Sequence, residues 1–150
     1  MSAEPTIDIT EQALQEQIVA FIRAFGLHRP EQTPCGEPVS VAEAHALLEL
    51  SHCSLLTQNA LAHRLRLEKS TVSRLVGILE RKGWITRARS AHDRRALELD
   101  LTDAGQHVAA QLARARQAKF ARLLSALPES RRPMVIEALG VLVEALHESH

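Results

Sequence analysis

The sequence predicts a mainly α-helical fold that contains one small β-hairpin. Hydrophobic residues make up 45% of the 150 residues but aromatic residues only 3%, so the core must be aliphatic, and the abundant Ala and Leu favour helix. Apolar side chains recur at three- and four-residue spacing along most of the chain, as they do on one face of a helix. Residues 97–101 instead alternate between apolar and polar, which is the pattern of a half-buried strand.

Two helices are predicted in the first third of the chain. Residues 10–27 hold apolar side chains at helical spacing, and Gly26 suits the end of that helix. Residues 28–39 include three Pro and one Gly, which predicts a loop. Ser40 and Glu43 have the spacing of a capping box, so a second helix should begin there and end at about residue 51.

A pair of closely spaced helices follows. Thr57 is a suitable N-cap for a short helix over 58–65, and residues 66–68 form a brief turn. A longer helix over 69–82 has one apolar stripe at helical period, and Gly83 is placed to end it. The arrangement of two helices joined by a tight turn is that of a helix-turn-helix.

The hairpin is predicted directly after this pair. Residues 84–86 suit a short strand, residues 87–95 are polar and basic, and residues 96–101 form a second strand. The two strands and their charged tip would form a wing beside the helix over 69–82. The sequence thus predicts a winged helix-turn-helix over 40–101.

The C-terminal third is predicted to be two helices. Thr102 is a candidate N-cap for a helix to about Leu124, with Phe120 and Leu123 among the side chains expected to be buried, and a last helix covers 131–147.

The outer helices should form a dimerisation region. The helices over 10–27 and 103–147 carry more apolar surface than a small winged domain can cover. We therefore expect them to pack across a two-fold axis, with 1–150 as one domain. The alternative is a three-helix bundle within one chain.

The charge distribution points to a polyanionic partner. The net charge of the whole chain is zero, but residues 62–95 hold ten Lys and Arg against three Asp and Glu, a local charge of +7. A local basic field matters more for a polyanion than the overall sum does. The basic residues also coincide with the predicted helix-turn-helix and wing, which favours double-stranded DNA over a merely solvated charged face.

The candidate DNA-binding residues lie on the helix over 69–82 and on the wing. Short polar and cationic side chains at a helix N-terminus can bond phosphates and base edges in the major groove, and an arginine can enter the narrow minor groove. The candidates are Lys69, Ser70, Thr71, Ser73 and Arg74 on the helix, and Arg87, Arg89, His92, Arg94 and Arg95 on the wing. Asp93 is out of place beside a phosphate backbone, so we expect it to pair with a nearby arginine and to fix the wing tip.

These residues carry a family resemblance. Residues 56–105, and in particular the patterns STVSRLVxxLExxGW and xDRRxxxLxLTxxG, resemble the MarR family of bacterial regulators. The resemblance implies a homodimer that binds a pseudo-palindromic operator, usually as a repressor, with Ser70, Thr71, Ser73 and Arg74 in the major groove and Arg94 and Arg95 in the wing. The chain has SAH where the family usually has D-P-x before DRR, so the wing turn is expected to differ and His92 to approach DNA.

The sequence leaves the sensed signal open. A small apolar or aromatic acid between helices is the usual effector in such regulators. Thiol sensing by Cys35 is an alternative, although Cys35 and Cys53 are expected to be reduced thiols. Zinc or copper is another, because soft and imidazole ligands suit these ions. The metal-ligand candidates are Cys35, His45, Glu49, His52 and His107, with Glu43 and Cys53 as further neighbours.

Other function classes are disfavoured. The chain has no Gly-rich phosphate loop, nucleophile elbow or H-E-x-x-H motif, so we expect no enzyme. A helical protein-interaction module that does not bind DNA remains a minor alternative. No apolar run reaches the length of a membrane span and no signal peptide is evident, so we expect a cytoplasmic protein with no membrane partner.

Overall fold

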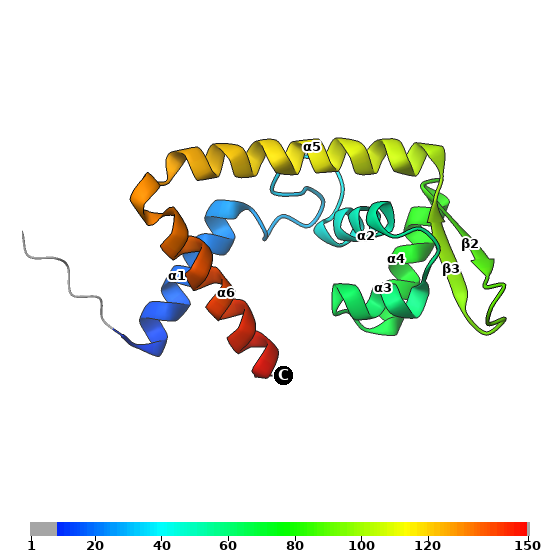
Figure 1. Cartoon of the computed structure of the whole chain (residues 1–150), viewed down its shortest axis with the longest axis horizontal. Helices are drawn as coiled ribbons and strands as arrows, with labels where there is room; N and C mark the ends of the chain where they lie inside the picture. The colour runs from blue at the N-terminus through cyan, green and yellow to red at the C-terminus, as the bar shows by residue number, and fades with distance from the viewer. Residues whose placement is uncertain (1–8, 150) are drawn as a thin grey trace, which may run out of the picture. The chain divides into compact units, whose positions relative to one another are not determined.

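The predicted mainly α architecture is confirmed by a computed structural model that describes residues 9–149 (Figure 1). The described chain forms two compact units, one up to Leu112 and one from Ala113 onward. Its elements in order are α1 (Glu11–Phe25), α2 (Val41–His52), β1 (Leu56–Thr57), α3 (Gln58–Leu65), α4 (Lys69–Arg81), β2 (Ile85–Arg89), β3 (Leu97–Leu101), α5 (Asp103–Ala126), the 3-10 helix η1 (Glu129–Arg131) and α6 (Arg132–Glu148).

The predicted helix starts agree with the observed caps. The hydroxyl of Thr10 accepts a hydrogen bond from the backbone N–H of Ala13, which starts α1. Ser40 and Glu43 form the expected reciprocal capping box at the start of α2. Thr57 caps α3 in the same way. Each bond satisfies an N–H group that has no partner within its helix, which fixes where the helix begins.

The core of the first unit is aliphatic and lies behind α4. Leu47 from α2, Leu61 from α3, Val76 and Leu79 from α4, and Leu99 from β3 are fully buried. These side chains join three helices to the sheet in one cluster. The packing holds α3 and α4 as a helix-turn-helix, with Arg66 at the turn in the left-handed region at φ 56°.

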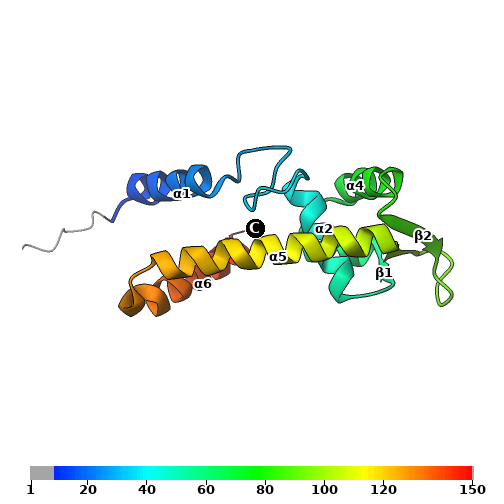
Figure 2. The same cartoon turned by 90° about the horizontal axis from the view of Figure 1, so that it is seen from above.

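The sheet has three antiparallel strands in the order β1-β3-β2. Its longer pair runs in register from Ile85 opposite Leu101 to Arg89 opposite Leu97. The prediction that β2 would end at residue 86 is wrong, and β1 was not predicted. Strand β1 has only two residues, which is too short to show the apolar–polar alternation of a strand. In β2 only the first residue is buried and the rest of the sequence is exposed and largely basic, so this alternation is missing there too. The hairpin of β2 and β3 projects beyond α2, α3 and α4 (Figures 1 and 2).

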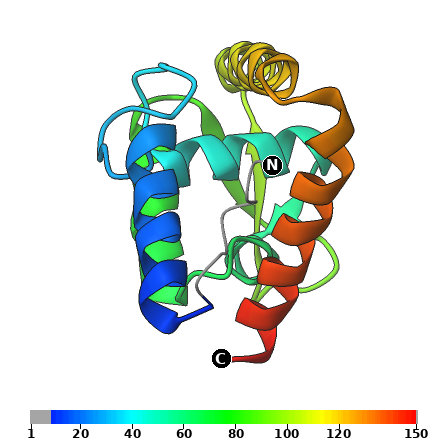
Figure 3. The ribbon, with the colours of Figure 1, turned by 90° about the vertical axis from the view of Figure 1, so that its left-hand side faces the viewer.

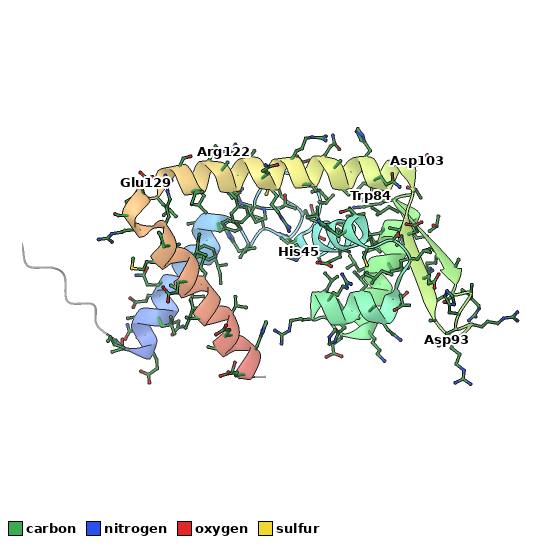
Figure 4. All side chains as sticks on the ribbon, viewed as in Figure 1. His45, Trp84, Asp93, Asp103, Arg122 and Glu129 are labelled. Atoms are coloured by element: carbon green, nitrogen blue, oxygen red, sulfur yellow. The ribbon has the colours of Figure 1, made fainter. Side chains whose placement is uncertain are left out.

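The start of α5 is bound to the turn that follows α4. Thr102 caps α5 by accepting from the N–H of Gly105, and its own hydroxyl donates to the carbonyl oxygen of Gly83 at 2.6 Å. The N–H of Thr102 donates to the carbonyl of Trp84 at 3.0 Å. Figure 4 shows Trp84 beside the first turn of α5, where Asp103 lies. Thr102 and Gly105, which are the Thr and Gly of the LTxxG pattern, therefore connect the start of α5 to the residues that follow α4.

The second unit consists of the end of α5, η1 and α6, and it has no core of its own. The chain turns from α5 into α6 through residues 127–131 (Figure 3). None of its described residues is buried. The expectation that Phe120 and Leu123 would be buried is wrong for the single chain, because they are 48% and 41% exposed. Helical spacing predicted an apolar face correctly but could not say what covers it.

Within residues 9–149, the structure contains no helix both long enough and apolar enough to cross a lipid bilayer.

Candidate nucleic-acid interface

Helix α4 presents a buried apolar back and an exposed polar front. Val72, Val76 and Leu79 have no exposed surface, and Leu75 is nearly buried. The front carries the side chains predicted to read DNA. Lys69, Ser70, Ser73 and Arg74 are exposed, and Thr71 is half-buried. A helix held from behind in this way can enter a major groove without losing its contacts with the core.

The N-terminus of α4 is open to an anion. Its N-cap residue, Glu68, makes no side-chain hydrogen bond to the first turn. The N–H groups of that turn are donors, and the helix dipole adds partial positive charge at the same place. An open surface hollow lies beside them at the turn between α3 and α4, and the basic residues His63, Arg66 and Lys69 are part of its lining. This end of α4 has the donors and charge that a phosphate group requires.

The wing tip is closed by a network of backbone hydrogen bonds. Ser90 is a buried residue, and its hydroxyl accepts hydrogen bonds from the N–H groups of His92 and Asp93 at 3.2 and 3.3 Å. The carbonyl of Asp93 accepts from the N–H of Ala96 at 3.0 Å. Arg89 donates from its guanidinium to the carbonyl of Arg94 at 2.8 Å. Ser90, the first residue of the unusual SAH sequence, thus organises the turn.

Asp93 is bonded within the tip in a different way from the one expected. Its carboxylate accepts the backbone N–H of Arg95 at 3.0 Å. Among the described residues no ion pair joins Asp93 to an arginine side chain, so the predicted pairing is wrong. A short acidic side chain commonly bonds a backbone N–H two residues further along a turn. Figure 4 shows Asp93 at the far end of the hairpin.

The predicted wing residues separate into two groups. His92, Arg94 and Arg95 lie in the tip, are exposed, and have side chains with no hydrogen bond or ion pair to any residue from 9 to 149. Arg87 and Arg89 lie in β2 and not in the tip, which corrects their predicted position. Arg87 donates two 3.0 Å bonds to the carboxylate of Glu80 in α4. On the wing, the exposed guanidinium groups of Arg89, Arg94 and Arg95 therefore have no carboxylate partner among the described residues, whereas that of Arg87 has one.

An ion pair holds the C-terminal end of α4. The ammonium group of Lys82 lies 2.5 Å from the buried carboxylate of Glu43 and 4.8 Å from the centre of the Trp84 ring. Burial by itself would raise the pKa of Glu43. The hydrogen bonds from Lys82 and from the backbone and hydroxyl of Ser40 outweigh it, so the pKa lies below its ordinary value. The carboxylate stays charged and joins the start of α2 to the end of α4.

The metal-ligand candidates are not brought together within one chain. Over the described part of the chain, no three His, Cys, Asp or Glu side chains lie close enough to hold a metal ion. Glu49 pairs with Arg64 at 3.2 Å, and Nδ1 of His52 lies 2.6 Å from the carbonyl of Leu48. Cys35 and Cys53 are half-buried free thiols. The remaining candidates, His45 and His107, are exposed.

Some residues that hold α4 and the wing in place were not singled out from the sequence. The ion pairs of Glu80 with Arg87 and of Lys82 with Glu43 join different elements of the fold. The hydroxyl of Ser90 instead bonds the backbone of a turn. For Glu80 the available signal was its place in the STVSRLVxxLExxGW pattern, and for Ser90 it was the departure from the usual D-P-x at SAH. Spacing alone does not show which charged side chains will pair.

Known proteins with the same architecture bind DNA. The model of the MarR family matches residues 38–96. The transcriptional repressor MdtR of Bacillus subtilis is 30% identical over 107 residues, which cover 71% of this chain and 69% of MdtR. The structure of the Staphylococcus aureus MepR–DNA complex aligns with a TM-score of 0.73 and 26% identity, covering 93% of this chain and 99% of that one.

A further solved structure supports the fold. FabT of Streptococcus pneumoniae, solved in complex with DNA, aligns with a TM-score of 0.81 at 24% identity over 94% of this chain and all of that one. Together, the buried scaffold behind α4, the wing and the identity to MdtR confirm a winged helix-turn-helix protein. The chain belongs to the MarR family of DNA-binding transcriptional regulators.

Proposed function

We propose that this protein is a repressor that binds a pseudo-palindromic operator as a homodimer and releases it when a small molecule binds. One observation carries the proposal. The polar front of α4 and the unpaired arginines of the wing tip are exposed on one unit, and the apolar side chains behind α4 are buried. A rigid support with free cations in front is what sequence-specific binding of a duplex requires.

In this proposal, α4 enters the major groove. Arg74 takes guanine with its two-pronged guanidinium, while Ser70, Thr71 and Ser73 bond phosphates or base edges. Lys69 and the open first turn of α4 bind the backbone. The placement is supported by the exposure of Arg74 and the absence of a side-chain cap from Glu68.

The wing tip would occupy the neighbouring minor groove. Arg94 and Arg95 supply the positive charge that a narrow minor groove attracts, and His92 approaches the backbone beside them. This placement of the tip residues is supported by the closed turn around Ser90. A tip whose motion is already limited loses less conformational entropy when it binds DNA.

Dimerisation would involve the helices at both ends of the chain, over 10–27 and 103–147, with 40–101 as the DNA-binding region. The support is the apolar surface that a single chain leaves exposed. Leu14 and Phe21 of α1 are 51% and 46% exposed. In α6 no residue is buried and six large apolar side chains are exposed: Met134, Ile136, Leu139, Val141, Val143 and Leu146. Apolar faces of this extent mark contacts between protein chains.

The repressor role rests on the relationship to MdtR, which is named a repressor. A repressor acts where its operator lies, so the protein would work in the cytoplasm. The releasing signal is proposed to be a small organic molecule, the usual effector in proteins that this sequence resembles. A thermal-shift screen with aromatic acids, zinc and copper tests this part, and stabilisation by a metal alone would contradict it.

A gel-shift titration with the DNA upstream of the protein's own gene tests the main proposal. We expect sequence-preferring binding with half-sites about 10 bp apart, and an affinity that falls steeply with salt as counterions are released. A scrambled fragment of equal length and composition is the control. Equal binding to both fragments at every salt concentration would overturn the proposal.

A further inference from the structure

Arg87 connects the wing to the DNA-facing helix. Its Nε and Nη2 atoms each lie 3.0 Å from a different carboxylate oxygen of Glu80. Glu80 is in the last turn of α4, and Arg87 is the central residue of β2. A two-pronged pair of this kind fixes orientation as well as distance, since both bonds must stay in line.

The backbone position of Arg87 is fixed as well. In the sheet it lies opposite Leu99 of β3, a residue with no exposed surface. Two residues further along β2, Arg89 bonds the carbonyl of Arg94 in the wing tip. A continuous set of contacts therefore runs from α4 through Glu80 and Arg87 into β2, and from β2 to the tip.

We propose that Glu80 and Arg87 are a positioning pair that sets the angle of the wing against α4, and that Arg87 does not contact DNA. The inference rests on the proposed function, in which α4 and the wing tip contact the duplex at the same time. Two elements that must fit neighbouring grooves need a fixed separation. The pair of Glu80 and Arg87 fixes this separation on the exposed side of the contact between α4 and the wing, which the apolar core does not reach.

The inference predicts an unexpected direction for the change in DNA affinity when the charge of Glu80 is removed. A carboxylate near a polyanion repels it, so loss of the charge at Glu80 should strengthen DNA binding if the residue has no other role. If Glu80 positions the wing, the loss should weaken binding instead. Glu68, at the other end of the same helix and beside the proposed phosphate site, has an exposed carboxylate with no cap bond, so its loss shows the electrostatic repulsion at its strongest.

The test compares E80Q, R87Q, R87K and the double variant E80Q/R87Q with wild type, with E68Q as the matched control. Operator affinity is measured by fluorescence anisotropy across a range of salt concentrations. Backbone amide hydrogen exchange over residues 85–89 is measured on the same proteins without DNA. R87K is the decisive single change, because it keeps the positive charge but cannot form the two-pronged bond.

We expect E80Q, R87Q and R87K each to weaken binding about two- to fivefold, with the double variant no weaker than R87Q. The salt dependence should stay that of wild type, and E68Q should bind as tightly as wild type or more tightly. The inference is overturned if E80Q binds more tightly, R87K binds like wild type, and R87Q lowers the slope of log affinity against log salt by about 1. That combination would identify Arg87 as a phosphate contact.

Failure of the proposed function is separable from failure of the inference. If wild type prefers no DNA fragment at low salt, the proposed function is wrong, whereas hydrogen exchange still tests the pair. Faster exchange over residues 85–89, of equal size in E80Q and R87Q, supports the inference. Unchanged exchange in both variants overturns it.

Discussion

At the scale of single residues, Gly105 shows how closely α5 approaches the backbone. A Cβ atom built at this position would overlap the carbonyl oxygen of Trp84 and lie 2.8 Å from its carbonyl carbon. The neighbouring atoms are backbone and are held by the bonds of Thr102, so they cannot move aside cheaply. Gly105→Ala should therefore lower the free energy of unfolding by about 3 kcal/mol, the upper end of the cost of overpacking.

Gly77→Ala is the matched control for Gly105→Ala. A Cβ at Gly77, inside α4, would meet only the end of the Arg81 side chain at 3.6 Å. This change should stabilise the protein by about 0.5–1 kcal/mol through helix propensity. Urea unfolding at one fixed protein concentration measures both variants. Equal stability of Gly105→Ala and wild type would show that the contact with Trp84 is not present in solution.

Glu43 gives the stability a dependence on pH. Its pKa is lower in the folded chain than its ordinary value, so the ion pair with Lys82 stabilises the protein above pH ~4.3. This stabilisation is lost as the pH falls through the folded-state pKa. Glu43→Gln should reduce the free energy of unfolding at pH 7 by about 1–3 kcal/mol. The difference from wild type should shrink below pH ~4.3.

Thermal unfolding of Glu43→Gln across the pH range measures this effect. Glu49→Gln, in the same helix, removes a more exposed pair with Arg64 and should cost at most about 1 kcal/mol. A Glu43→Gln deficit that stayed constant from pH 7 to pH 3 would mean that the lost stability comes from packing and not from the charge.

At the scale of elements, the α4 front is tested by Arg74→Ala. If Arg74 bonds a guanine, its loss should cost about 1–3 kcal/mol of binding free energy and relax the preference at one base position. Arg81→Ala, at the opposite end of the same helix, is the control and should affect all sequences alike. Selection of binding sites from a randomised operator measures both. A uniform loss across sequences for Arg74→Ala would mean that it contacts only phosphate.

The wing tip is tested at Asp93. Because its carboxylate accepts the N–H of Arg95, Asp93→Ala should loosen the turn and weaken operator binding without unfolding the protein. Asp93→Asn keeps an acceptor oxygen but removes a negative charge near DNA, so it should bind at least as tightly as wild type. Anisotropy titrations compare the two. Weak binding by Asp93→Asn together with normal binding by Asp93→Ala would contradict the role of the backbone bond.

The elements differ in how far the sequence could predict them. Period and caps placed α2, α3 and α4 within one or two residues, because local hydrogen bonds and an apolar stripe determine those helices. The extent of β2 was missed, since its pairing with β3 is a contact between distant residues and its exposed side chains are basic. The charged pairs of Arg87 and Glu80 and of Lys82 and Glu43 also depend on tertiary position. The composition of residues 62–95 revealed a local positive charge, but it did not show which arginine side chains are paired with carboxylates in the folded chain.

At the scale of the whole molecule, the exposed apolar faces lead to the last prediction. Leu139 lies on α6 with 47% of its surface exposed, and Val143 and Leu146 follow on the same side of the helix. If this side packs against a second chain, Leu139→Glu would bury a carboxylate in an apolar interface, which is strongly unfavourable. We expect Leu139→Glu to be monomeric at micromolar concentration.

The control for Leu139→Glu is Glu144→Lys, a charge change at an exposed polar position of the same helix, which should remain dimeric. Sedimentation velocity measures the assembly of both variants. A pseudo-palindromic operator binds two copies tightly only when they are joined, because the second contact then occurs at high effective concentration. The monomeric variant should consequently lose most of its operator affinity while its α4 and wing stay folded. A dimeric Leu139→Glu that binds like wild type would place the interface elsewhere on the chain.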